Sequence, residues 1–367
     1  MFFTLLTGKE DELSEYCVTL ETEKQIYMVR KSYSINKNRT EKWKADVQKS
    51  VMFYNEWFLN FAPKAYVNAR KEAIDKVENM FHDIECFNSL SVDILKNNPD
   101  AITILRLSTT PPLSRDRLIG LSGVSANLID KMEEGRFPPR MSQEEIDESL
   151  ERIIEIIHSL LDYDMMPWLK QKSYPHETDR NLAIQVIGDR VCGSLSDPII
   201  RNEQERRQLN SIGEYLNRKG YRFVESNAIE DFQNMECGMY SFHLNVLAER
   251  RDGKSVNMPI DVVIKRKNAI AGELPVLIEC KSAGDFTNTN KRRKEEAIKI
   301  EQLQLKYGQK IELVLFLCGY FDSGYLGYEA GEGIDWIWEH RIEDFKKMGD
   351  INEGKRIKAQ KHTRCIG

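Results

Sequence analysis

One stretch decides the fold of this chain: Leu274-Pro275-Val276-Leu277-Ile278-Glu279-Cys280-Lys281. Its apolar run is typical of a buried strand, and residues two apart on a strand point to the same face. Glu279 and Lys281 therefore share one face of a strand that is otherwise apolar. Buried Glu and Lys side chains are rarely tolerated unless they are paired or bind a metal, so their presence here calls for a partner or a cation.

A second acidic position precedes this strand, where Pro259-Ile260-Asp261 opens the β-branched run Val262-Val263-Ile264. Adjacent strands lie about 4.8 Å apart, so a hairpin would bring Asp261 beside Glu279. Mg²⁺ is the natural cation because it prefers oxygen ligands and keeps several waters. We expect Asp261, Glu279 and the Cys280 carbonyl to bind it. In a hydrolytic reaction Lys281 would orient or deprotonate the water that attacks the substrate and would stabilise the charge of the transition state. The alternative is a simple cross-strand ion pair on a solvated sheet face.

A third acid is suggested by helical spacing. The segment 202–219 is predicted to be a helix ending at Gly220, with apolar positions at Leu209, Ile212 and Leu216. Glu205 lies four residues before Leu209 and so shares its face. We predict that Glu205 is an outer or second-metal ligand; the alternative is an N-terminal acid favoured by the helix dipole.

The periodicity divides the chain near residues 170–180. Helical stripes cover 43–61, with a break expected at Ala62-Pro63, and then 67–82, 90–107 and 143–163. Strands are predicted at 240–246, 256–264, 276–281 and 313–317, with helices at 202–219 and 291–307. The fold class is therefore α+β: an unassigned extension 1–42, a helical domain 43–170 expected to recognise DNA, and a catalytic domain 171–367 whose mixed sheet has the order α-β-β-β-α-β and is flanked by helices.

The helical half contains a pattern that looks like a helix-turn-helix at residues 114–135. Gly123 permits a tight turn, Ser125 is suited to cap a second helix, and Gly135 ends it. Such a helix presents its N-terminal side chains to base edges in the major groove. Acidic residues on the same helix favour the alternative that the unit is structural. The predicted DNA contacts are Arg115, Ser125, Asn127 and Lys131.

Basic and amide residues flank the predicted metal site. The run Lys265-Arg266-Lys267 and the loop and helix start at 284–294 would lie where backbone phosphates approach. The alternative is that these charge runs are solvated faces, as most charge runs are. The predicted contacts in the second segment are Asn288, Asn290, Lys291, Arg292 and Arg293.

Composition limits the class of protein. The 367 residues are 41% hydrophobic and 30% charged, as in ordinary globular proteins, and the net charge of −5 does not exclude local basic patches. Seven scattered cysteines without a C-x-x-C spacing argue against a disulfide framework and a zinc site. No apolar stretch reaches the roughly 18 residues of a membrane helix, and no signal peptide is evident, so a cytoplasmic protein is expected.

The sequence resembles the XamI-type restriction endonucleases of the PD-(D/E)xK nuclease superfamily from about Trp43 onward. The most specific stretches are Ser108–Gly120, Ile278–Glu296 and Cys318–Glu329. The resemblance implies a PD-(D/E)xK core and a type II enzyme that cuts double-stranded DNA at a short palindrome with Mg²⁺. It also implies a cognate DNA methyltransferase that protects host DNA. The superfamily's Pro-Asp is interrupted here as Pro259-Ile260-Asp261. A palindromic target favours a two-fold homodimer.

Two other functions are compatible with the same residues. One is a DNA repair or recombination nuclease that recognises structure rather than sequence. The other is a DNA-binding regulator whose nuclease-like core is inert. Cleavage of plasmid DNA into discrete fragments with magnesium distinguishes a restriction endonuclease from both.

Overall fold

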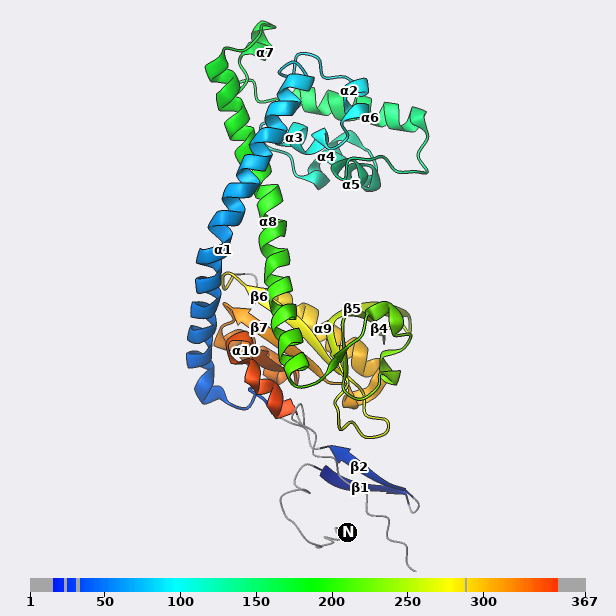
Figure 1. Ribbon diagram of the computed structural model, residues 1–367. Helices are drawn as coiled ribbons and strands as arrows, with labels where there is room; N and C mark the ends of the chain where they lie inside the picture. The colour runs from blue at the N-terminus through cyan, green and yellow to red at the C-terminus, as the bar shows by residue number, and fades with distance from the viewer. Residues whose placement is uncertain (1–15, 23–24, 31–33, 288, 349–367) are drawn as a thin grey trace, which may run out of the picture. The chain divides into compact units, whose positions relative to one another are not determined.

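The computed structural model describes residues 16–22, 25–30, 34–287 and 289–348 (Figure 1). The chain forms two compact units, one of Met1–Glu56 with Gln204–Gly367 and one of Trp57–Glu203. Both limits between the units fall inside long helices, α1 (Thr40–Asp83) and α8 (Glu177–Arg218). Residues 43–56 thus belong to the first unit and 171–203 to the second, whereas the sequence pattern suggested a division near residue 170.

The first unit is built on a six-stranded mixed sheet with the order β3-β4-β5-β6-β7-β8. Strands β4, β5 and β6 are antiparallel neighbours, whereas β6, β7 and β8 are parallel and β3 is parallel to β4. The expected α+β class with a mixed sheet is confirmed. The chain runs α8-β3-β4-β5-β6-α9-β7, so the short strand β3 is an addition to the expected order. The strands are β3 (Arg222–Phe223), β4 (Met239–Glu249), β5 (Ser255–Ile264), β6 (Val276–Ala283), β7 (Leu313–Gly319) and β8 (Asp335–Trp338).

Helices cover both faces of this sheet. On one face, Val262 and Ile278 pack in a core that includes Leu216 of α8. On the other face, Leu277 packs in a core that includes Leu303 of α9 (Thr289–Tyr307). Alternate residues of a strand feed opposite cores, which is why the central strands read as continuous apolar runs. Further elements of this unit are α10 (Ser323–Gly331) and the short 3₁₀ helices η1 (Ser226–Ala228), η2 (Phe232–Asn234), η3 (Gly308–Lys310) and η4 (Glu339–Met348).

The second unit is helical and has a core of its own, which includes Phe81, Leu118 and Ile153. Ser142 starts α6 with a capping box, since it accepts from Glu145 N–H while the Glu145 carboxylate accepts from Ser142 N–H. Besides parts of α1 and α8, the helices are α2 (Val92–Asn97), α3 (Ala101–Leu107), α4 (Arg115–Ser122), α5 (Ala126–Glu133), α6 (Gln143–Leu160) and α7 (Trp168–Gln171).

The break expected at Ala62-Pro63 is wrong, because α1 continues through Pro63. An internal proline removes one helical hydrogen bond and costs roughly 3 kcal/mol. Apolar burial on either side of it, at Tyr54 and Ala69 for example, offsets that cost. Within the stretch 1–42, β1 (Tyr16–Thr22) and β2 (Gln25–Arg30) form an antiparallel pair. No helix in the described ranges is long and apolar enough to cross a membrane.

Candidate active site

The site lies where two neighbouring strands separate. Strands β5 and β6 are paired from Val262↔Ile278 to Ile264↔Val276, and the ladder ends one residue before Asp261 and Glu279. Asp261 is held in the gap by a hydrogen bond of 2.7 Å that its Oδ2 accepts from the Cys280 backbone N–H. The Cys280 side chain packs against the core on the α8 face. The β5–β6 ladder therefore ends just where the two carboxylates begin, and the gap leaves room for both side chains.

Glu279 is nearly fully buried and is surrounded by charge. Its side chain is 2% exposed, and its Oε2 lies 3.1 Å from Lys281 Nζ and 2.7 Å from Lys299 Nζ. Lys281 Nζ also lies 3.0 Å from Oε1 of Glu296, a fully buried residue. Two acids and two bases thus form one buried network, which is the condition under which charges are tolerated in an interior.

Sequence reasoning missed the two members of this network that come from α9, Glu296 and Lys299. A signal existed, because these residues share the spacing of a buried stripe with Ile300 and Leu303. Ile300 and Leu303 are core residues on the α9 face of the sheet. Polar residues at the start of an apolar stripe therefore marked a helix that covers a charged site.

Two observations show that these residues fit a divalent cation. Glu279 Oε1 is buried and has no hydrogen-bond partner among the described residues. Burial raises the pKa of Asp261 to about 6, and the nearby Glu279 carboxylate adds to this effect. A cation would satisfy the orphaned oxygen and relieve the repulsion between the two carboxylates. Oxygen donors of this kind suit a hard cation.

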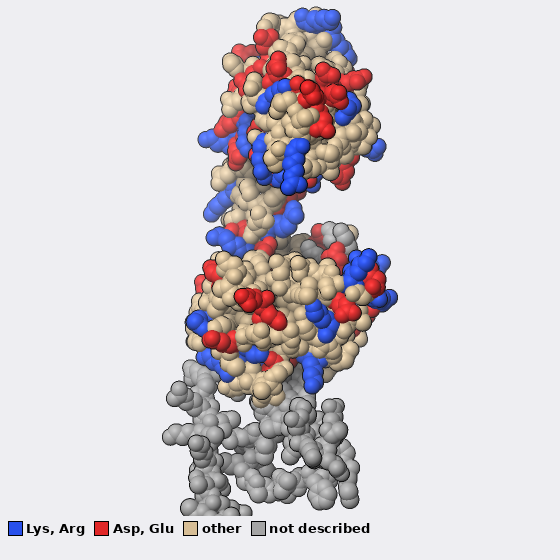
Figure 2. Space-filling view, turned by 90° about the vertical axis from the view of Figure 1, so that its right-hand side faces the viewer, with Lys and Arg blue, Asp and Glu red and all other residues tan. Residues whose placement is uncertain are grey.

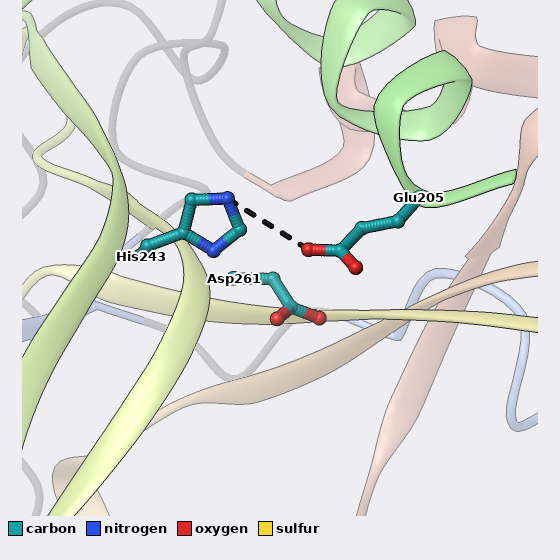
Figure 3. A group of neighbouring side chains, drawn as sticks. All are labelled: Glu205, His243 and Asp261. Atoms are coloured by element: carbon teal, nitrogen blue, oxygen red, sulfur yellow. Dashed lines mark ion pairs between the residues drawn. The ribbon is translucent and has the colours of Figure 1, made fainter. Parts of the chain in front are cut away.

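A second group of possible ligands shares Asp261. One ligand atom each of Glu205, His243 and Asp261 lies within 4.8 Å of the others, and His243 Nε2 is 3.7 Å from Glu205 Oε1 (Figure 3). These side chains come from α8, β4 and β5 and converge on one point. Glu205 was predicted to face inward with Leu209, yet its side chain is 48% exposed, so it lies at the edge of the core. One of its carboxylate oxygens nevertheless lies within 4.8 Å of a carboxylate oxygen of Asp261.

His243 was not predicted, and it is the most unusual residue of the group. Its φ is +51°, a left-handed conformation within β4. His243 and Asp261 lie between the pairs Phe242↔Val262 and Leu244↔Ile260 of the β4–β5 ladder. Non-glycine residues rarely adopt this conformation, and such residues cluster at functional sites. In the sequence His243 reads as one outward position of an alternating strand, so no signal distinguished it.

Lys281 is held as an ammonium. Burial by itself lowers the pKa of Lys281, but the carboxylates of Glu296 and Glu279 outweigh burial and raise it above its ordinary value. In this arrangement the side chain donates to Glu279 and forms an ion pair with Glu296. It is therefore suited to orienting a neighbour and stabilising negative charge, rather than to removing a proton.

The residues 114–135 form two short helices, α4 and α5, as expected. Gly123 has φ +64°, and Ser125 caps α5 by accepting from Leu128 N–H at 3.1 Å. Two of the predicted DNA contacts here are engaged with acids: Arg115 lies 2.8 Å from Asp130, and Lys131 lies 2.8 Å from Glu134. Asn127 is exposed on the first turn of α5.

Most of the predicted DNA contacts around residue 290 lie outside the described part of the structure. Asn288 lies outside the described residues, as do the side chains of Asn290, Lys291 and Arg292. Arg293 is described and lies over the Tyr328 ring, 5.2 Å from its centroid.

The run Lys265-Arg266-Lys267, which was expected to lie near phosphates, is not a solvated basic patch, because Lys265 and Arg266 are both buried. Arg266 is 1% exposed and forms ion pairs with Glu273 at 2.9 Å and Glu312 at 2.6 Å. Its guanidinium is thus a buried structural cation.

On the face of the molecule in Figure 2, acidic and basic side chains lie in small neighbouring groups on each unit.

Comparison with known proteins identifies the family. The sequence matches the XamI restriction endonuclease family over residues 85–338. It is 48% identical over 315 residues to "Type II restriction enzyme SalI" of Streptomyces albus G, covering 86% of this chain and 99% of that protein. A crystal structure of a Vibrio cholerae protein aligns at a TM-score of 0.26 with 11% identity, covering 77% of this chain and 57% of that one, which is too low to bear on the fold. The chain belongs to the XamI restriction endonuclease family.

Proposed function

We propose that this restriction endonuclease hydrolyses phosphodiester bonds of double-stranded DNA at the gap between β5 and β6, with Asp261, Glu279 and Lys281 as its catalytic residues. The observation that carries the proposal is the buried Glu279, which has one unpartnered oxygen and lies beside Asp261 and Lys281. Both lysines pair with Oε2 of Glu279, which leaves Oε1 as the oxygen that a cation could bind. Buried polar atoms of folded proteins usually have a partner, so a cation bound here would supply the missing one. The strand arrangement is compatible with a PD-(D/E)xK core.

Asp261, Glu279 and the Cys280 carbonyl would hold the metal ion, for which we propose Mg²⁺ because the donors are oxygens. Bound there, the cation would activate a water and neutralise phosphate charge. Glu205 and His243 extend the donor set around Asp261. We assign Glu205 as an outer ligand of this metal ion or as a ligand of a second one.

Lys281 would stabilise the charge that develops on the phosphate in the transition state, because it lies next to Glu279 and stays protonated. Glu296 and Lys299 would fix this geometry from α9: one holds Lys281 from behind and the other fills the remaining side of Glu279. Lys281 is thus positioned before substrate arrives.

The relative from Streptomyces albus G is a Type II restriction enzyme, and the 48% identity supports the same class of activity here. We therefore propose a short palindromic target, a homodimer whose two-fold axis matches the symmetry of that target, and a cognate methyltransferase that protects host DNA. In this proposal α4 and α5 contribute to recognition as a helix-turn-helix, through Asn127.

The test is digestion of linear DNA of known sequence with Mg²⁺ or with EDTA, followed by mapping of the fragment ends. Discrete ends at one short sequence are expected with Mg²⁺ alone. Glu279→Gln and Lys281→Met should each lower the cleavage rate by about 100-fold or more. Glu332→Gln, a change at the exposed acid that follows α10, should cleave normally.

Binding to the mapped sequence should survive in both inactive variants. If both still cut at wild-type rates, the assignment of the site is wrong. Cleavage confined to branched or damaged DNA would support a repair nuclease instead.

A further inference from the structure

The outer half of the β4–β5 hairpin is a two-stranded ribbon. Strand β4 pairs with β3 at Met239 and Tyr240, and β5 pairs with β6 at 262–264. From Leu244↔Ile260 to Glu249↔Ser255, β4 and β5 pair with each other and with no further strand among the described residues. We call the segments 244–249 and 255–260 the ribbon. A two-stranded β-ribbon is of a width that the major groove of DNA admits.

The alternation of side chains reverses where the ribbon begins. Phe242 and Leu244 are both even-numbered, yet Phe242 packs in the core that contains α8 and Leu244 in the core that contains α9. On β5, Val262 and Ile260 differ in the same way. The reversal occurs at His243 and Asp261, where His243 has its left-handed backbone. Even-numbered ribbon residues consequently face α9, and odd-numbered ones face outward.

The outward face of the ribbon carries unengaged amides. Asn245 and Asn257 are exposed, and neither side chain has a hydrogen-bond partner among the described residues. They lie on neighbouring strands, where Asn245 is opposite Pro259 and Asn257 is opposite Leu247. Asparagine is the side chain that reads adenine through two hydrogen bonds in the major groove.

These amides line a hollow of ≈ 660 Å³, which is within the range of binding sites. The hollow is also lined by Asn227 of η1, by the acids Glu230 and Asp231 of the link between η1 and η2, and by His243. Carboxylates repel backbone phosphates but accept from the amino group of cytosine. Lys306 also lines the hollow. The amides and acids therefore suit base edges, whereas Lys306 suits a neighbouring phosphate.

The distance between this face and the proposed cleavage site can be estimated along β5. Asn257 lies four residues from Asp261, about 13 Å at 3.3 Å per residue. Base pairs stack about 3.4 Å apart, so this span is about four base pairs. The hairpin tip beyond carries Arg251 and Lys254, whose side chains are 81% and 77% exposed and pair with Glu301 at 2.5 Å and Asp252 at 3.9 Å. Exposed ion pairs contribute little, so both cations can exchange these partners for phosphates flanking the target.

We propose that the outward face of the ribbon, through Asn245 and Asn257, reads base edges of the DNA substrate in the major groove within about four base pairs of the cleaved bond. This inference rests on the proposed function and names a specificity-determining surface for it. It differs from recognition by α4 and α5, which belong to the other unit.

The test measures kcat/KM on duplexes that carry each single base-pair change in the mapped target. Wild-type cleavage of the unchanged duplex checks the proposed function by itself. Asn245→Ala and Asn257→Ala should lower kcat/KM on that duplex by about 5- to 150-fold, and each should lose discrimination at one base pair while keeping it at the others. Asn234→Ala, an exposed amide of η2 that does not line the hollow, should keep the wild-type profile.

A second measurement identifies the groove. A 7-deazapurine at the affected base pair removes the N7 acceptor from the major groove; it should slow the wild type and have no further effect on the variant that lost discrimination there. Equal loss on all duplexes, or unchanged discrimination at every base pair, would overturn the proposal. So would a wild type that cuts the 7-deazapurine duplex at full rate.

Discussion

The ion pair between Lys281 and Glu296 allows a quantitative prediction. The atoms Nζ and Oε1 are 3.0 Å apart, Glu296 is fully buried, and Lys281 is 19% exposed. At an effective dielectric constant of about 20 the gross attraction is about 5.5 kcal/mol, part of which desolvation of both groups cancels. Lys281→Met leaves Glu296 in the core without this partner, so the variant should lose about 3 kcal/mol of unfolding free energy.

Glu296→Gln should cost less, about 1 to 2 kcal/mol, because the amide can still accept from Lys281. In the double variant the unpaired buried charge is gone. The two changes should therefore be non-additive by about 1.5 to 3 kcal/mol, with the double variant more stable than the sum predicts.

Urea denaturation in EDTA, with all four proteins at the same pH, measures this coupling. Lys310→Met, an exposed lysine in η3, combined with Glu296→Gln is the matched control and should be additive. A coupling below about 0.5 kcal/mol for Lys281 and Glu296 would refute the view that the network positions Lys281.

Three further predictions concern separate parts of the molecule. Burial raises the pKa of Glu329 to about 8, so the folded state keeps a proton that the unfolded chain releases, and stability should fall as pH rises from about 4.5 through 8. Glu329→Gln should remove that fall, which makes the variant about 2 to 4 kcal/mol more stable than wild type at pH 8.5 and equal to it at pH 4; parallel melting curves at all pH values would contradict this. Gly319 has φ +97°, and a Cβ there would lie 2.1 Å from the Ala283 carbonyl oxygen. Gly319→Ala should therefore destabilise the protein by at least about 2 kcal/mol in thermal unfolding, and a neutral result would mean that the backbone relaxes. Asn127→Ala should weaken binding to the mapped target by about 1 to 3 kcal/mol and leave non-specific binding unchanged, if α5 reads a base; equal loss on both DNAs would make its role structural.

Local periodicity predicted the strands of the site well. The β-branched and apolar runs around Asp261 and Glu279 form β5 and β6 at nearly the expected residues. Because side chains alternate with a period of two, the shared face of Glu279 and Lys281 followed directly. The helix that contains Glu205 was also expected, although it forms the end of a helix of 42 residues. A proline within an apolar stripe misled the prediction for α1, since packing outweighed the local preference.

The charges around the site were harder to interpret. Arg266 lies in a basic run that reads as a solvated face, yet it is buried between Glu273 and Glu312. Glu312 is 46 residues away in the chain, and no local pattern links it to Arg266. Composition shows that charges are present, but pairing over such separations depends on how the strands and helices pack.

The sequence by itself determined which strands exist and which of their residues share a face, and it predicted that Glu279, Lys281 and Asp261 lie close together, because a strand's period is local and independent of its neighbours. Tertiary structure decided what surrounds that centre. The parallel connection from β6 to β7 carries α9 across the sheet and brings Glu296 and Lys299 to the site. The left-handed backbone of His243 reverses the alternation of β4 and turns Asn245 outward. Both depend on contacts between distant segments, whose energies appear only when the chain has packed.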